Sequence, residues 1–185
     1  MKMESIKSHL RPYSILQKRE TTINHAFASA LAPNDEYNDE VVSNALKFLG
    51  QNPEHDLTCV YCGKKAETWD HVYGLVKNMN FSGYGHVVGN LLPCCKQCNS
   101  EKGNKYWLDY LKGKYVSNKK RNNKILRIKA YLNKYLRSRI NYNILKAKHA
   151  SDIKKYEALK SKMFSLMKRA DKLASSIRLK ISKSS

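Results

Sequence analysis

Four cysteines of this chain form two closely spaced pairs, and a fifth lies beside the second pair. The chain has 185 residues. Cys59 and Cys62 form one Cys-x-x-Cys motif, and Cys95 and Cys98 form the other. Two such motifs can hold one zinc ion, because each short loop supplies two thiolates of a tetrahedral site. We predict a structural Zn²⁺ with no open coordination position; the alternative is four buried free thiols. The surplus thiol, Cys94, is expected to face the core; a less regular Cys94-x-x-x-Cys98 pair of ligands is the alternative.

Polar residues suited to hydrolytic chemistry lie between and just after these motifs. Asp70 and His71 are neighbours in an extended stretch, while Asn90 precedes a short apolar run. Asn99 follows the last cysteine. An imidazole with a pKa of about 6.5 can take a proton from water at neutral pH. Carboxylate and amide oxygens are ligands that suit Mg²⁺ and Mn²⁺. Each residue alone is more often structural, and Asn99 could simply cap a helix. Their joint spacing, framed by the two cysteine motifs, favours a catalytic site.

The order of these residues resembles that of the HNH nucleases, also called ββα-metal nucleases, in their zinc-bearing form. That pattern is Cys-x-x-Cys, Asp-His on a first strand, Asn in the loop or second strand, and Cys-x-x-Cys-(His or Asn)-x-x-Lys opening a helix. The resemblance covers about residues 57–111. It implies that His71 is the general base and that Asn90 fixes the loop orienting it. It also implies that Asp70 and Asn99 hold a catalytic Mg²⁺ or Mn²⁺.

The positive charge is confined to the C-terminal part of the chain. The net charge is +20, yet residues 1–111 hold 12 Lys+Arg against 12 Asp+Glu. Residues 112–185 hold 23 Lys+Arg against 3 Asp+Glu, and no Gly or Pro follows Gly113. So large a surplus indicates a polyanionic partner. The nuclease resemblance favours double-stranded DNA over a membrane surface.

The expected fold class is α+β: a zinc-stabilised ββα-metal module with N-terminal helices, followed by an all-α basic helical region. The expected ranges are 1–55 for the N-terminal helical segment, 56–112 for the nuclease module and 113–185 for the basic region. Helices are predicted at about 21–31, 35–49, 96–111 and 118–148, with a further helix after a turn at 149–152.

That last helix carries a seven-residue apolar repeat, which predicts a coiled-coil-like seam. Its members are Tyr156, Leu159, Met163, Leu166, Ala170, Leu173 and Ile177.

Basic residues after the second cysteine motif are the candidates for phosphate or base contacts. They are Lys102, Lys105, Lys119, Lys120, Arg121, Lys124, Arg127, Arg137 and Arg139. Solvated lysines are the alternative interpretation for Lys102 and Lys105. His86 lies in a glycine-rich loop. Two interpretations of His86 stay open, a contact to phosphate or catalytic water and an ordinary loop histidine.

These patterns lead to the hypothesis of a metal-dependent, site-specific DNA endonuclease of restriction type. A double-strand break by such a chain needs two copies, and the apolar seam would form the homodimer. The alternatives are a homing or phage nicking enzyme acting as a monomer, a non-catalytic zinc-stabilised nucleic-acid-binding protein, and RNA as substrate. The sequence shows no secretory signal and no apolar stretch long enough to span a membrane. We therefore expect a cytoplasmic protein of prokaryotic or phage origin, with no membrane partner.

Overall fold

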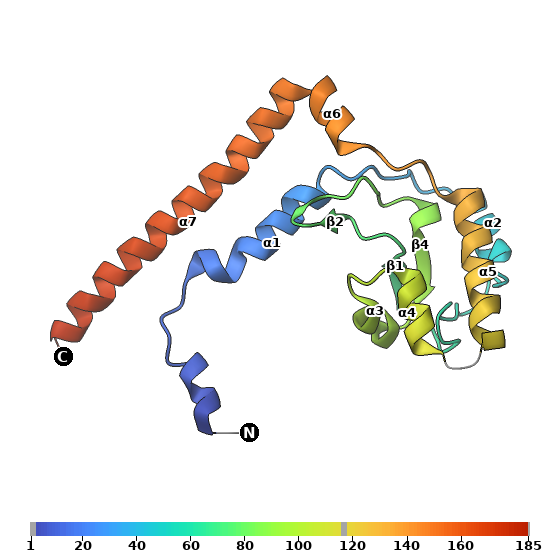
Figure 1. Ribbon diagram of the computed structural model, residues 1–185, viewed down its shortest axis with the longest axis horizontal. Helices are drawn as coiled ribbons and strands as arrows, with labels where there is room; N and C mark the ends of the chain where they lie inside the picture. The colour runs from blue at the N-terminus through green and yellow to red at the C-terminus, as the bar shows by residue number, and fades with distance from the viewer. Residues whose placement is uncertain (1–2, 116–117, 185) are drawn as a thin grey trace. The chain divides into compact units, whose positions relative to one another are not determined.

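The computed structural model describes residues 3–115 and 118–184, and its fold is α+β and mostly helical (Figure 1). In chain order the elements are η1 (Met3–Ser8), α1 (Ile15–Ser29), α2 (Asp39–Phe48), β1 (Thr68–His71), β2 (Val76–Lys77), β3 (Asn80–Phe81), η2 (Val88–Asn90), β4 (Leu91–Cys94), α3 (Lys96–Lys102), α4 (Trp107–Lys114), α5 (Asn118–Tyr135), α6 (Tyr142–Lys148) and α7 (Ala150–Ser184). Among the described residues, no helix combines the length and apolar character needed to cross a membrane.

The chain divides into two compact units. We call Ala28–Tyr142 the hairpin unit, and Met1–Phe27 together with Asn143–Ser185 the terminal unit. These units do not coincide with the expected ranges 1–55, 56–112 and 113–185. The main difference is α5, which was expected in a separate basic region and instead packs into the core of the hairpin unit. Its apolar stripe of Ile128, Tyr131 and Leu132 is buried there.

The hairpin unit is built around a two-stranded antiparallel sheet. β1 pairs with β4 so that His71 faces Leu91 and Thr68 faces Cys94. α3 begins directly after β4 and contacts β1. The Cys95 side chain caps this helix by accepting a hydrogen bond from the Cys98 backbone N–H. Strand, strand and helix therefore follow the predicted ββα order, with the cysteine motif at the strand-to-helix junction (Figure 1).

Gly89 allows α5 to approach the loop before β4 closely. A Cβ at this position would lie 2.1 Å from the carbonyl oxygen of Tyr135. The Tyr131 hydroxyl donates to the carbonyls of Val88 and Leu91 from the same helix. α5 therefore supports the segment that leads into β4.

Two predicted helices are interrupted. The helix expected at 96–111 ends at Lys102, where Gly103 has φ 47° and its N–H caps the carbonyl of Asn99. A glycine in this left-handed region ends a helix without the steric cost that a Cβ would bring. The helix expected at 118–148 ends at Tyr135, and residues 136–141 are irregular before α6 begins. The second break has no Gly or Pro, so composition alone gave no sign of it.

The terminal unit is held by contacts between α1 and α7. Asp171 of α7 accepts hydrogen bonds from the backbone N–H groups of Ile15 and Leu16, at 2.7 and 3.1 Å. It thereby satisfies donors at the start of α1. Near the other end of α1, the Tyr156 hydroxyl donates to the Phe27 carbonyl at 2.9 Å. The two helices are therefore antiparallel.

Apart from Tyr156, the predicted heptad seam is not the face of α7 that packs on α1. Its leucines Leu159, Leu166 and Leu173 are more than half exposed. The more buried positions on this helix include Tyr156, Phe164 and Met167. The packed positions, which also include Ile153 and Ala174, likewise recur three and four residues apart. Most of them lie one position after a seam residue, about 100° around the helix. The apolar repeat is thus present but exposed in the single chain.

Candidate functional site

The four motif cysteines gather into one cluster. The sulfur atoms of Cys59, Cys62, Cys95 and Cys98 all lie within 4.8 Å of one another. The Sγ atoms of Cys62 and Cys95 are 3.7 Å apart. Zn–S bonds of about 2.3 Å in a tetrahedron place the sulfurs about 3.8 Å apart. The cluster therefore fits a zinc ion, and the prediction that both motifs serve one metal site agrees with the structure.

Cys94 lies beside this cluster but outside it. It is fully buried, as expected, and its Sγ lies 3.9 Å from the Sγ of Cys59. Its thiol donates to the Cys95 carbonyl at 3.3 Å. Cys94 therefore has an internal partner and packs with the core.

His71 ends β1 and lies next to a second histidine. Its Nε2 is 3.1 Å from Nδ1 of His86, so one of the two rings donates and the other accepts. Burial, with smaller contributions from the nearby His86 and Lys102, lowers the pKa of His71 to about 4. The imidazole is therefore neutral at pH 7. A neutral imidazole can accept a proton, as the predicted general base must.

His86 is placed by backbone pairing with the segment before α2. Its N–H donates to the Pro33 carbonyl at 2.8 Å, and its carbonyl accepts from the Asp35 N–H at 3.1 Å. The two imidazoles therefore meet although their residues are 15 positions apart. The sequence left the role of His86 open because only the fold brings this loop to His71.

Asn90 links the chain segments next to both histidines. It is fully buried, and its Oδ1 accepts from the Tyr73 N–H at 2.9 Å. Its Nδ2 donates to the carbonyls of Tyr73 and Gly85, both at 3.0 Å. Tyr73 follows His71 by two residues and Gly85 precedes His86. Asn90 therefore joins the two segments, and its role in orienting His71 for catalysis stays a prediction.

Asp70 points away from the imidazole pair, to the opposite face of β1. Its Oδ1 accepts from the Lys102 ammonium at 3.0 Å and its Oδ2 from the Tyr61 hydroxyl at 2.6 Å. Lys102 also donates to the His71 carbonyl at 2.8 Å. Burial raises the pKa of Asp70, against the opposing effect of the Lys102 charge. Both carboxylate oxygens are engaged, so Asp70 as it lies here does not fit a Mg²⁺ ligand.

Lys102 corrects one prediction from the sequence. It was expected either to contact phosphate or to be solvated, yet its side chain is 2% exposed. Its charge is needed by the buried Asp70, which explains its position. Asn99 is half-buried on α3, three residues before Lys102. Residues at this spacing are neighbours on a helix surface, and the metal-ligand role of Asn99 stays a prediction.

The other predicted DNA contacts are divided between surfaces. Lys105 and Arg139 line a cleft of about 410 Å³ together with Tyr73, Tyr84 and Tyr106. On α5, Lys124 donates to the Val60 carbonyl and Arg127 to the Leu49 carbonyl. Arg121 donates to the Tyr115 carbonyl and to the Asn118 side chain, and Arg137 pairs with Asp35. Lys119 and Lys120 are exposed.

The bonds of Lys124 and Arg127 fasten α5 to the loops around the first cysteine motif and the end of α2. Lys124 and Arg127 therefore stabilise the packing of α5 in this structure, whether or not they also contact phosphate.

Comparison with known proteins adds no assignment, because no family model, curated protein or solved structure matches this chain.

Proposed function

We propose that this protein is a DNA endonuclease of the HNH type, which hydrolyses phosphodiester bonds with His71 as general base. The observation that carries the proposal is the neutral His71 imidazole at the end of β1, in contact with His86. The partner strand β4 leads directly into the second motif of the four-cysteine cluster. The chain order of these features is that of the zinc-bearing HNH pattern.

His71 would act on the attacking water. Its neutral ring takes a proton from the water as the oxygen attacks phosphorus. The bond from phosphorus to O3′ breaks, and O3′ takes up a proton from solvent. The products are a 5′-phosphate and a 3′-hydroxyl. Asn90 holds the loops on both sides of the imidazole pair, and Lys102 holds the His71 carbonyl.

A divalent cation is part of the proposal, because the family it resembles uses Mg²⁺ or Mn²⁺ to stabilise charge at the scissile phosphate. Asn99 of α3 would supply an amide oxygen to the cation, but Asp70 would first have to exchange Lys102 for the metal. The cleavage assay therefore measures whether an added divalent cation is required. The role proposed for the zinc cluster is structural.

Charge supports a nucleic acid as the substrate. The hairpin unit carries 18 Lys+Arg against 10 Asp+Glu, and the terminal unit carries 17 against 5. Double-stranded DNA cut at specific sites is the favoured substrate, and nicking by a monomer is the second candidate. The exposed leucines of α7 favour the dimer, because apolar surface of this kind is usually covered by a partner.

Plasmid cleavage tests the proposal. The zinc-loaded protein is incubated with supercoiled DNA, with Mg²⁺, with Mn²⁺ or with neither. Conversion to nicked or linear DNA that requires the added cation and disappears in His71→Ala is expected. Binding without conversion across varied DNA and RNA substrates would favour the non-catalytic nucleic-acid-binding protein. Molecular mass in solution, with and without DNA, separates the dimeric from the monomeric form.

A further inference from the structure

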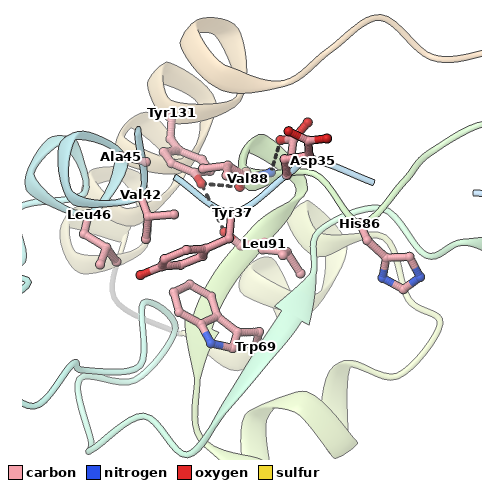
Figure 2. A pocket seen from close by; sticks show the side chains of 11 residues that line it. Asp35, Tyr37, Val42, Ala45, Leu46, Trp69, His86, Val88, Leu91 and Tyr131 are labelled. Carbon is pink, nitrogen blue, oxygen red and sulfur yellow. Dashed lines mark hydrogen bonds between the residues drawn. The ribbon is translucent and has the colours of Figure 1, made fainter. Parts of the chain in front are cut away.

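The hairpin unit contains an apolar pocket beside the imidazole pair. It has a volume of about 260 Å³. Figure 2 shows side chains from α2, β1, β4 and α5 around it, with His86 at its edge. The apolar and aromatic residues that line it are Tyr37, Val42, Ala45, Leu46, Trp69, Val88, Leu91 and Tyr131. The hydrolytic step described above uses none of these side chains.

Strand geometry places this pocket on the His71 side of the sheet. Trp69 and His71 are two residues apart on β1, so their side chains emerge from the same face, while Asp70 emerges from the other. His86 lines the pocket and its Nδ1 is 3.1 Å from Nε2 of His71. A group in the pocket would therefore lie next to the nucleotide whose phosphate reaches His71.

Two exposed aromatic rings mark the pocket as a stacking site. Trp69 is 44% exposed and Tyr37 is 78% exposed, although both line the pocket (Figure 2). Exposed aromatic rings are the usual platforms for unpaired bases in proteins that bind single strands. The volume lies below the range of about 300–1,000 Å³ typical of drug-sized ligands, which favours one small planar ring system.

The charge at the rim favours a base over a phosphate. Asp35 and Glu36 line the pocket within a protein that is otherwise strongly basic. The Asp35 carboxylate is fixed by the Val88 N–H at 2.8 Å and by Arg137 at 2.6 Å. The exposed Glu36 carboxylate repels phosphate but can accept a hydrogen bond from the amino group of a base such as cytosine.

We propose that this pocket receives one unpaired nucleobase next to the scissile phosphate, stacked on Trp69 and Tyr37. The proposal deepens the proposed nuclease function and rests on it for the position of the phosphate. Extruding a base from a duplex costs least where the base is already unpaired. Within double-stranded DNA, the pocket would therefore favour cleavage next to an unpaired base.

Equilibrium binding to three DNA duplexes tests the pocket. They carry one unpaired cytosine, an abasic site in place of that cytosine, or no unpaired position. Affinity is measured by fluorescence anisotropy without added Mg²⁺ or Mn²⁺, so that hydrolysis does not enter. Stacking of one base predicts about 5- to 150-fold tighter binding of the cytosine duplex than of the abasic duplex. Trp69→Ala and, independently, Tyr37→Ala should each reduce this ratio toward one.

Tryptophan emission gives a second readout. The only other tryptophan, Trp107, is 1% exposed, so quenching by a bound base reports on Trp69. Tyr106→Ala is the control, because this 46% exposed aromatic lines the basic cleft instead. The control should leave the ratio of cytosine to abasic binding unchanged. Equal binding of the two duplexes by wild type overturns the proposal, as does a ratio that only Tyr106→Ala abolishes.

These outcomes are separate from those of the cleavage assay. If the protein binds the cytosine duplex more tightly than the abasic duplex but never cleaves DNA, the base-pocket proposal stands and the nuclease proposal fails. A protein that cleaves DNA but binds the cytosine and abasic duplexes equally retains the nuclease function and loses the base pocket.

Discussion

The Lys102 ammonium lies 3.0 Å from the Asp70 carboxylate, and the two side chains are only 2% and 4% exposed. Lys102 also holds the carbonyl of His71. This ion pair therefore joins α3 to the strand end that carries the candidate general base. Because Lys102 already balances the charge of Asp70, substitutions in this pair can distinguish a structural role of Asp70 from a metal-binding role.

Removing one partner of this pair should destabilise the protein strongly. Asp70→Asn leaves a buried ammonium and Lys102→Met leaves a buried carboxylate, each costing about 3–5 kcal/mol of unfolding free energy. The double variant should lose less than the sum of the single losses. Urea unfolding of the four proteins measures this. Purely additive losses would contradict the pair, and an Asp70→Asn variant of unchanged stability without cleavage would mark Asp70 as a metal ligand.

The zinc prediction separates Cys94 from the four cluster cysteines. One zinc per chain is expected in wild type and in Cys94→Ala, because Cys94 lies outside the cluster. Cys95→Ala should lose zinc and much of its thermal stability, since structural zinc contributes directly to folding. Elemental analysis and thermal unfolding measure both. Loss of zinc from Cys94→Ala with retention by Cys95→Ala would assign the ligands differently.

The lowered pKa of His71 predicts how stability depends on pH. The unfolded imidazole binds a proton near its ordinary pKa of 6.5, while the folded one binds it only near 4. The unfolded state therefore holds more protons in this window, and folded stability falls as the pH is lowered through it. Wild type should lose more stability than His71→Gln between pH 6.5 and pH 4. An NMR titration of His71 with a midpoint near 6.5 would contradict this.

Asn90 should act through the loops it holds. Asn90→Ala leaves the half-buried Tyr73 N–H and two carbonyls without their side-chain partner, which costs about 1–3 kcal/mol of unfolding free energy. Cleavage should fall as well, because both histidine segments lose their link. Chemical denaturation and cleavage rates at a temperature where the variant is fully folded measure the two effects. Unchanged stability and rate would remove Asn90 from the site.

Salt dependence should distinguish exposed cations from those that serve packing. Neutralising about eight phosphates gives a slope of about −7 in log affinity against log salt. Lys119→Gln and Lys120→Gln should each reduce the slope by about one, since both residues are exposed. Arg127→Gln should mainly lower stability, because its guanidinium holds the Leu49 carbonyl. Equal effects of all three on the slope would contradict this division.

Short-range patterns were sufficient to predict the cysteine cluster and the strand–strand–helix order. The spacing of Cys59 and Cys62 is local, because two cysteines three residues apart can bind the same metal ion from one short loop. Contacts between residues far apart in the sequence could not be predicted from such local patterns. His86 meets His71 only because its loop pairs with the segment before α2. Lys102 looked like a surface cation, since no local pattern links it to Asp70.

The division of the chain was also beyond sequence patterns. The charge boundary near residue 112 suggested a separate basic arm, yet α5 presents its apolar stripe to the core and its cations to solvent and backbone carbonyls. The charged residues of an amphipathic helix show which of its faces is exposed, but they do not show which part of the chain its apolar face packs against. The exposed leucines of α7 could not be predicted either. Two sets of positions, one residue apart, both recur every seven residues along this helix, and only the fold shows which set packs.

The most direct measurement of the central claim is the single-turnover cleavage rate of wild type and His71→Ala at equal DNA occupancy, with Mg²⁺ present. His71 is proposed to take the proton of the attacking water, and general-base catalysis contributes about 10²–10⁴-fold in rate. His71→Ala should therefore bind DNA with wild-type affinity and cleave it slower by about that factor. An unchanged rate, or the absence of cleavage by wild type on every DNA that it binds, would contradict the proposed function.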